Sequence, residues 1–240
     1  MRPTALVTGA TAGIGHAFAD LLAAAGHDLV VVARDADRLE QVAQQWRQQW
    51  AVAVTPLVAD LSCHEECARV EARLREPERP VDVLINNAGF GLHQGFASGD
   101  LASEQALLDV LVRAVMRLSH AAVGPMSRRG HGALINVSSV AGWWPHSTYC
   151  AAKAYVTCFS QALHREVRPR GVNVMALCPG FTRTEFHRRG GYDTARIPAF
   201  MWLSADRVVA TAWRDAARGK SVSVPGVRYK LLRLFLRAWY

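Results

Sequence analysis

The chain contains little lysine, and acidic residues are scarce in its last third. Only Lys153, Lys220 and Lys230 are lysines among the 28 basic residues of the 240-residue chain. Residues 160–240 hold five acids against 15 bases, whereas residues 1–159 are close to neutral. Such an excess of basic residues is typical of proteins that bind a nucleic acid, a membrane surface or an anionic substrate. The alternative is that the excess only reflects a genome that prefers arginine codons. No recognised nucleic-acid-binding module accompanies the charge, so we expect no nucleic-acid partner.

Long apolar runs, a leader segment and a cysteine framework are also missing. No run of about 18 uncharged apolar residues occurs, which argues against a transmembrane helix, and a strand-like TALVTG follows Met1 too closely for a signal peptide. The five cysteines match no disulfide framework. Cys63, His64 and Cys67 lack further ligands at a usual spacing, so we expect no metal site. These features together predict a cytoplasmic protein with reduced thiols.

The pattern along the chain alternates between strand-like and helix-like stretches. Capping boxes at Asp37–Glu40 and Ser62–Glu65 predict the starts of two helices, and Ser103 predicts the start of a long helix to about Met126. Other helices are expected near 13–25, 148–168 and 204–218, and strands near 4–8, 28–33, 52–58, 81–85, 133–138, 171–177 and 221–225. No linker interrupts the pattern, which predicts that residues 1–240 form one domain. We expect a single-domain Rossmann-type α/β fold, a doubly wound parallel sheet of about seven strands with helices on both faces.

In such sheets ligands bind beyond the carboxyl ends of the strands, so the first strand-to-helix turn is a candidate site. It reads Thr8-Gly9-Ala10-Thr11-Ala12-Gly13-Ile14-Gly15. Glycines let the backbone approach a pyrophosphate, and the helix that follows offers unpaired N–H groups to the anion. The alternative is that the glycines serve only a tight turn.

The end of the second strand indicates which dinucleotide binds. Proteins that prefer NAD place a carboxylate here to bind the ribose hydroxyls, whereas this chain has Arg34, followed one turn later by Arg38. A guanidinium binds a 2′-phosphate through charge-assisted hydrogen bonds. We therefore expect NADP(H) rather than NAD(H), the alternative being a solvated arginine at a strand end.

Five motifs occur in one order along the chain: Thr8-Gly9-x-x-x-Gly13-x-Gly15, Asn86-Asn87-Ala88-Gly89, Ser139, Tyr149-x-x-x-Lys153 and Pro179-Gly180. With these motifs the chain resembles the short-chain dehydrogenases/reductases over essentially its whole length. The resemblance implies that Asp60 contacts adenine and that Asn86, Asn87, Ala88 and Gly89 line the adenosine ribose. It further implies that Pro179, Gly180, Thr182 and Thr184 lie near the nicotinamide and the phosphates. Asp60 as a cap of its own turn, and 86–89 as a plain loop, are the alternatives.

Tyr149 and Lys153 are four residues apart, so they share one face of a helix. A neighbouring ammonium is expected to lower the pKa of the tyrosine, which would exchange a proton with the substrate. Ser139, rather than the adjacent Ser138, would hydrogen-bond the substrate oxygen. The catalytic residues expected are therefore Ser139, Tyr149 and Lys153.

Two features depart from the family. Ser139 and Tyr149 are closer together than in many members, and the short loop between them contains Trp143 and Trp144, which either line an apolar pocket or pack on the core. Leu111 stands where the family usually has an asparagine that holds a water of the proton relay. The relay either passes through solvent admitted by the short loop, or turnover is slow.

The basic excess falls on two segments. A substrate flap is expected at 183–203, where arginines (Arg183, Arg188, Arg189 and Arg196) suit an anionic group and apolar residues (Phe186, Tyr192, Phe200, Met201 and Trp202) suit an apolar body. The alternative is a mobile, solvated flap without a substrate contact. The tail 227–240 is basic and amphipathic, suited to a membrane surface, a partner groove, its own domain or a second subunit.

These features predict an NADP(H)-dependent oxidoreductase that interconverts a small-molecule carbonyl and an alcohol, working as a reductase rather than as a dehydrogenase. We also expect the chain to form a homo-oligomer. The rival from another class is a non-catalytic NADP(H)-binding sensor or scaffold, which Leu111 suggests.

Overall fold

Within the residues that the structure describes, seven strands build one parallel sheet, and its first three strands are rich in the β-branched and apolar residues that favour strands. The computed structural model describes residues 2–195 and 197–237, with side chains in the last helix described as far as Leu232. The sheet order is β3-β2-β1-β4-β5-β6-β9. The strands are β1 Thr4–Thr8, β2 Asp28–Ala33, β3 Val54–Val58, β4 Val83–Asn86, β5 Gly132–Val137, β6 Val172–Leu177 and β9 Val222–Ser223. The expected doubly wound sheet is confirmed.

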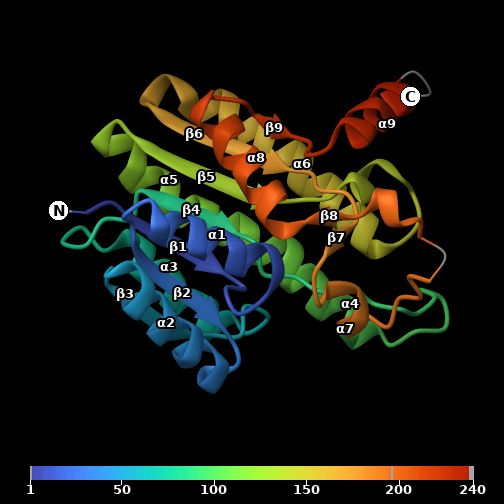
Figure 1. Cartoon of the computed structure of the whole chain (residues 1–240), viewed down its shortest axis with the longest axis horizontal. Coiled ribbons are helices and arrows are strands. Elements are labelled where there is room, and N and C mark those ends of the chain that lie inside the picture. Colours follow the sequence, from blue (N-terminus) through green and yellow to red (C-terminus); the bar gives the residue numbers. More distant parts are fainter. Residues whose placement is uncertain (1, 196, 238–240) are drawn as a thin grey trace.

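Helices cover both faces of this sheet (Figure 1). Alternate residues of β1 show why: Ala5 and Val7 belong to one buried cluster, Leu6 belongs to the other, and all three are fully buried. The helices are α1 Gly13–Ala24, α2 Ala36–Trp50, α3 His64–Arg75, α4 Leu101–Leu108, α5 Val115–Arg129, α6 Thr148–Val167, α7 Phe186–Arg189, α8 Ala205–Ala217 and α9 Val227–Arg237.

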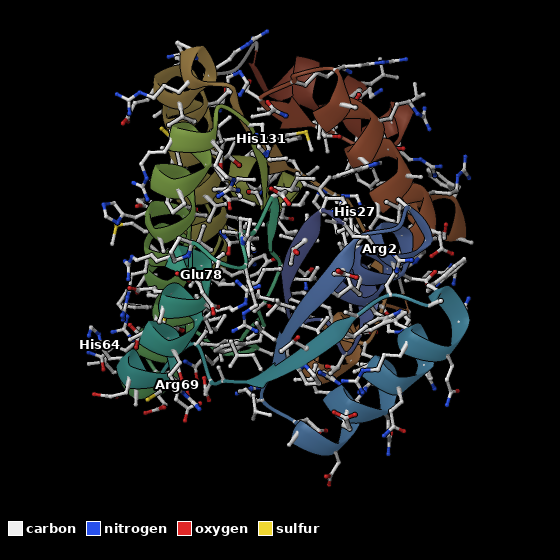
Figure 2. The ribbon with its side chains drawn as sticks, turned by 90° about the vertical axis from the view of Figure 1, so that its left-hand side faces the viewer. Arg2, His27, His64, Arg69, Glu78 and His131 are labelled. Carbon is white, nitrogen blue, oxygen red and sulfur yellow. The ribbon has the colours of Figure 1, made fainter. Side chains whose placement is uncertain are left out.

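The two helical layers are built from different parts of the chain. Helices α1, α2 and α8 supply residues to the first cluster, and α3 and α5 supply residues to the second. Figure 2 shows the sheet between the layers, with His64 and Arg69 of α3 on the outside of one layer. Within the described ranges, none of the helices is long and apolar enough to cross a membrane.

Both predicted capping boxes are wrong. The N-cap of helix α2 lies two residues earlier than expected, because Asp35, and not Asp37, accepts a hydrogen bond from the backbone N–H of Arg38 at 3.0 Å. Helix α3 begins after Cys63, whose side chain caps nothing. The Ser62 hydroxyl donates instead to Asp60 at 2.7 Å, a local bond that competes with the cap.

The long helix expected from Ser103 is interrupted. Asp100 is its N-cap, and the Ser103 hydroxyl donates to Asp100 at 2.6 Å. Between α4 and α5, residues Asp109–Ala114 form a π-helical turn. Such insertions are frequent at functional sites, and this one contains Leu111.

A second, two-stranded sheet lies outside the main one and was not predicted. β7 (Thr182–Arg183) pairs with β8 (Leu203–Ser204) in parallel. The expected flap therefore leaves the domain along β7 and returns along β8. The pairing of β7 with β8 holds the two ends of the flap together. The flap itself lies beyond the carboxyl ends of the main strands (Figure 1).

Candidate active site

The first strand-to-helix turn is shaped to receive an anion. Gly9 and Gly13 have φ angles of +65° and +58°, which glycine adopts readily. Helix α1 begins at Gly13, its N-cap Ala12 makes no side-chain cap hydrogen bond, and its first turn has no acidic residue. The N–H groups at the start of α1 are thus left without a side-chain cap, and their dipole favours negative charge. These donors fit the pyrophosphate of a dinucleotide.

Asn87 braces this turn from the neighbouring strand. Its side-chain N–H₂ donates to the carbonyls of Thr8 at 2.9 Å and Gly9 at 3.2 Å. The Thr8 hydroxyl accepts the backbone N–H of Asn87 at 2.9 Å and of Ala88 at 3.0 Å. A Cβ on Gly15 would lie 2.3 Å from the Asn87 amide nitrogen, so only glycine fits there. The turn and the loop after β4 thus hold each other in place.

Asn86 is directed into the interior. It is 3% exposed, and its amide donates to Asn136 at 2.8 Å and to Ser119 at 3.3 Å. Of the four residues predicted to line the adenosine ribose, Asn86 therefore points away from the site, and the prediction remains for Asn87, Ala88 and Gly89. Gly89 is close to Lys153, since a Cβ there would lie 3.9 Å from the Lys153 ammonium nitrogen.

Arg34 extends from the end of β2 into solvent, with its side chain 70% exposed. Its guanidinium lies 3.6 Å from the Asp60 carboxylate. Burial opposes ionisation of Asp60, but hydrogen bonds from Ser62 and the charge of Arg34 outweigh it and lower the pKa of Asp60. Asp60 therefore caps its own turn, while its contact with adenine stays a prediction.

Ser139, Tyr149 and Lys153 come together at the carboxyl end of β5. The Lys153 ammonium is buried, donates to the Val137 carbonyl at 2.7 Å and lies 5.6 Å from the centre of the Tyr149 ring. Burial lowers the pKa of Lys153 to about 8. Ser139 hydrogen-bonds with Tyr149. Ser138 turns the other way, because its hydroxyl donates to the Lys153 carbonyl at 2.7 Å.

The pKa of Tyr149 does not follow the sequence-based expectation. Burial raises the pKa of Tyr149 above its ordinary value, and the hydrogen bond with Ser139 opposes this only in part. The expected lowering by Lys153 is therefore wrong for the chain alone, because desolvation of the phenolate dominates. Tyr149 therefore keeps its proton at neutral pH.

The glycine turn, the loop after β4 and the Ser139–Tyr149–Lys153 cluster all lie within one stretch of the chain that matches a known protein family. Residues 3–193 match the short chain dehydrogenase family. The chain belongs to this family. The match covers the glycine turn, the loop after β4 and all three residues of the Ser139–Tyr149–Lys153 cluster.

Relatives of this short chain dehydrogenase include enzymes with different substrates. A short-chain dehydrogenase from Sphingobium yanoikuyae in complex with NADPH is 37% identical, with a TM-score of 0.90 over 99% of this chain and 94% of that one. The bulky-bulky ketone specific alcohol dehydrogenase from Comamonas testosteroni is 33% identical, with a TM-score of 0.85 over 99% and 93%. Sulfoacetaldehyde reductase 2 of Chromohalobacter salexigens is 35% identical over 81% of this chain and 79% of the relative.

In this family member, Leu111 forms an apolar wall behind the cluster. It is fully buried and packs with Leu107 and Ala152, and Tyr149 packs against this group. A Cβ on Gly89 would lie 2.7 Å from Leu111. An apolar side chain thus occupies the position where the family's relay asparagine is expected.

The two tryptophans of the short loop in this short chain dehydrogenase have different surroundings. Residues Val140–Trp143 form a 3₁₀ turn. Trp143 packs against the first core cluster, whereas Trp144 is 58% exposed. Of the two predicted alternatives, core packing holds for Trp143.

The flap of this short chain dehydrogenase covers the tyrosine with aromatic rings. The Phe186 ring is 5.6 Å from that of Tyr149 and stacks on Tyr192 at 6.2 Å. The Tyr192 hydroxyl donates to the Leu92 carbonyl at 3.1 Å, which ties the flap to the loop after β4. Of the predicted flap residues, Arg196 lies outside the described part of the chain.

Thr182 and Thr184 lie at the base of the flap. The Thr182 hydroxyl donates to the Gly180 carbonyl at 2.9 Å, and Thr184 contacts Gly13 of the glycine turn. Sequence reasoning missed Glu185, which follows directly and accepts two hydrogen bonds from Arg38. No local pattern reveals this pair, because 147 residues separate its members.

The tail of this family member begins as part of the domain. Tyr229 is 1% exposed, its hydroxyl donates to the Met201 carbonyl at 2.6 Å, and it accepts the backbone N–H of Phe181 at 3.0 Å. A Cβ on Gly180 would lie 1.9 Å from the Tyr229 ring. The first turn of α9 therefore packs on the flap base, and residues 238–240 of the predicted tail lie outside the described residues.

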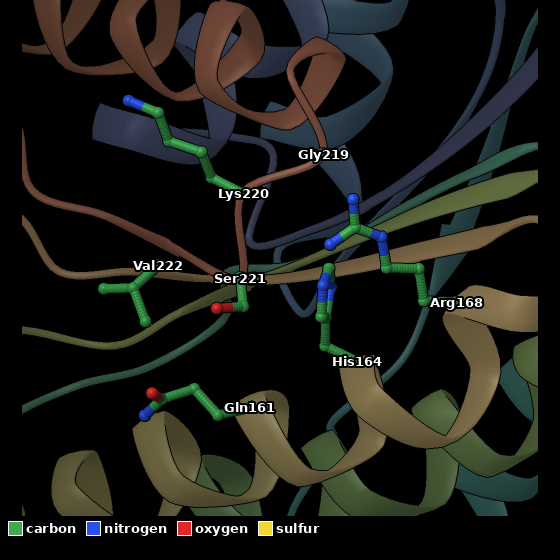
Figure 3. A pocket seen from close by; sticks show the side chains of 7 residues that line it. All are labelled: Gln161, His164, Arg168, Gly219, Lys220, Ser221 and Val222. Carbon is green, nitrogen blue, oxygen red and sulfur yellow. The ribbon is translucent and has the colours of Figure 1, made fainter.

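A pocket of this short chain dehydrogenase lies near the C-terminal end of α6, away from Tyr149 and Lys153. It has a volume of about 430 Å³ and is lined by Gln161, His164, Arg168, Gly219, Lys220, Ser221 and Val222 (Figure 3). None of these was a predicted site residue. In the described ranges, no group of three or more His, Cys, Asp or Glu side chains is placed to hold a metal ion.

Proposed function

We propose that this chain is an NADP(H)-dependent oxidoreductase that interconverts a carbonyl and an alcohol, working as a reductase. The observation that carries the proposal is the meeting of Ser139, Tyr149 and Lys153 next to the loop after β4, which also contacts the glycine turn before α1. The glycine turn would hold the pyrophosphate, Arg34 the 2′-phosphate, and Lys153 a ribose hydroxyl. When bound, the cofactor supplies or accepts the hydride.

The three side chains divide the remaining work. Ser139 hydrogen-bonds the substrate oxygen and stabilises the negative charge that develops on it. Tyr149 donates its proton to that oxygen, and its raised pKa supports the direction of reduction. The pKa of Lys153, about 8, leaves the amine charged at neutral pH, so it steadies the tyrosinate formed after the transfer.

The flap supports a substrate with an apolar body. Phe186 and Tyr192 stack next to Tyr149 and offer an apolar surface where the substrate would lie. The relative named for bulky-bulky ketones agrees with this class. An anionic group on the substrate, as in the compound that names the sulfoacetaldehyde reductase, stays a prediction. Two of the flap arginines that would bind such a group, Arg188 and Arg189, already face Glu185. Homo-oligomer formation and contact of the tail with a membrane also stay predictions.

The test is consumption of NADPH by the purified protein with a panel of aldehydes and ketones. Tyr149→Phe should lower kcat by about 10²-fold or more, the range of general acid catalysis. Tyr155→Phe, on the exposed side of α6, is the matched control and should keep full activity. NADPH binding without turnover of any carbonyl would favour the non-catalytic rival, and turnover indifferent to Tyr149→Phe would refute the proposed mechanism.

A further inference from the structure

Three consecutive flap residues, here called the strap (residues 184–186), touch three separate elements. Thr184 contacts the glycine turn, since a Cβ on Gly13 would lie 2.9 Å from its methyl carbon. Glu185 binds Arg38 in the first turn of α2. Phe186 packs on Tyr149 of α6. The proposed function assigns the pyrophosphate to the glycine turn, the 2′-phosphate to Arg34 just before α2, and a ribose hydroxyl to Lys153 of α6. The strap therefore contacts the protein near each of these parts of the cofactor site.

The contact between Glu185 and Arg38 is bidentate. The two guanidinium nitrogens donate to the two carboxylate oxygens at 2.8 and 3.1 Å, a planar geometry specific to arginine. Arg189 also pairs with Glu185, and Arg188 lies 3.9 Å away. The hydrogen bond from Arg38 is the main reason that the pKa of Glu185 falls to about 2. The carboxylate is thus charged at neutral pH.

Fold stability does not account for this pair. Both side chains are about one third exposed, and ion pairs at such positions contribute about 0–1 kcal/mol. The pair instead joins the flap to α2 across 147 residues of sequence. Arg34, by contrast, is 70% exposed and only loosely paired with Asp60. The two arginines are therefore placed for different tasks.

We propose that Glu185 is a positioning residue that fastens the strap to α2 through Arg38 and so slows dissociation of the nicotinamide cofactor. This inference rests on the proposed function. Arg34 then selects between NADPH and NADH, whereas Arg38 retains both. The cofactor leaves only when the pair opens, because the strap otherwise ties together the elements assigned to its two ends.

The experiment measures the dissociation rate of NADPH and of NADH by stopped-flow displacement, following the fluorescence of the bound reduced nicotinamide without substrate. Glu185→Gln and Arg38→Gln should each raise both rates by about three- to fivefold, the effect of losing one partly exposed bidentate pair. The double variant should be no faster than either single variant, because the two residues act as a unit. Arg165→Gln, at an exposed position on α6 outside the flap, is the matched control and should change neither rate by more than about twofold.

Arg34→Gln completes the design. It should weaken binding of NADPH but not of NADH, because Arg34 is assigned to the 2′-phosphate. This result distinguishes the choice of cofactor by Arg34 from the slow release of either cofactor through Arg38 and Glu185. Unchanged rates in Glu185→Gln and Arg38→Gln would overturn the proposal. A faster release of NADPH alone in Arg38→Gln would also overturn it and return Arg38 to 2′-phosphate binding. Failure of the unaltered protein to bind either dinucleotide would instead refute the proposed function.

Discussion

At the level of single residues, Lys153 shows how the interior sets the chemistry of the site. Its ammonium lies in the core with the Val137 carbonyl as hydrogen-bond acceptor, and burial lowers its pKa to about 8. Burial acts on Tyr149 in the opposite sense and raises its pKa. The two shifts have one cause, because desolvation favours the neutral form of each group. The sequence spacing shows that the pair is adjacent but not how deeply it is buried.

This burial predicts a pH dependence of stability. The unfolded chain binds the Lys153 proton up to its ordinary pKa of 10.5, whereas the folded chain releases it near pH 8. The free energy of unfolding of the cofactor-free protein should therefore rise between pH 8 and 10.5, relative to Lys153→Met, by about 1–3 kcal/mol. Urea denaturation of both proteins at a series of pH values measures the difference. A difference independent of pH would contradict the assigned burial of the charge.

At the level of elements, the start of α2 gives a direct comparison of two aspartates. Asp35 caps the helix, whereas Asp37 lies in its first turn. Asp35→Ala should lower the free energy of unfolding by about 1 kcal/mol, the usual effect of losing a cap. Asp37→Ala removes only a favourable charge near the helix N-terminus and should cost less, about 0.3–0.5 kcal/mol. Equal losses in chemical denaturation would show that Asp35 is not the cap.

The same elements show what the sequence can predict. Strand β2 was predicted at its observed bounds, because its residues are almost all apolar and the flanking turns are clear. The helix starts at Asp37 and Ser62 were wrong, because nearby polar side chains compete for the same N–H groups and Asp35 and Asp60 form the bonds that exist. Such competition is decided by backbone geometry that the capping pattern does not contain.

The candidate site divides in the same way. Tyr149 and Lys153 are four residues apart, and the glycine turn is contiguous, so local sequence could reveal both. Glu185 could not be found, because its partner Arg38 is distant in sequence and a lone flap glutamate has no local signature. The π-helical turn at Leu111 also has no pattern of its own in the helical periodicity.

At the level of the whole molecule, Tyr229 connects the tail to the flap. Tyr229→Phe would leave the Met201 carbonyl and the Phe181 N–H without their partner, so it should lower the free energy of unfolding by about 1–3 kcal/mol. Limited proteolysis within the flap should become faster as well. Tyr155→Phe, on an exposed face, is the control and should change stability by less than about 0.5 kcal/mol. A Tyr229→Phe protein as stable as the unaltered one would refute the role of this hydroxyl.

The position of Tyr229 has a consequence for synthesis of the protein. Tyr229 follows Phe181, the residue whose N–H it accepts, by 48 residues. During translation the strands of the main sheet up to β6 and the start of the flap are made before this hydroxyl exists. The glycine turn and helix α6 are thus synthesised while the flap base still lacks its Tyr229 hydrogen bonds. Fastening of the flap base by Tyr229 is therefore a late event in synthesis, set by the order in which the ribosome delivers the residues.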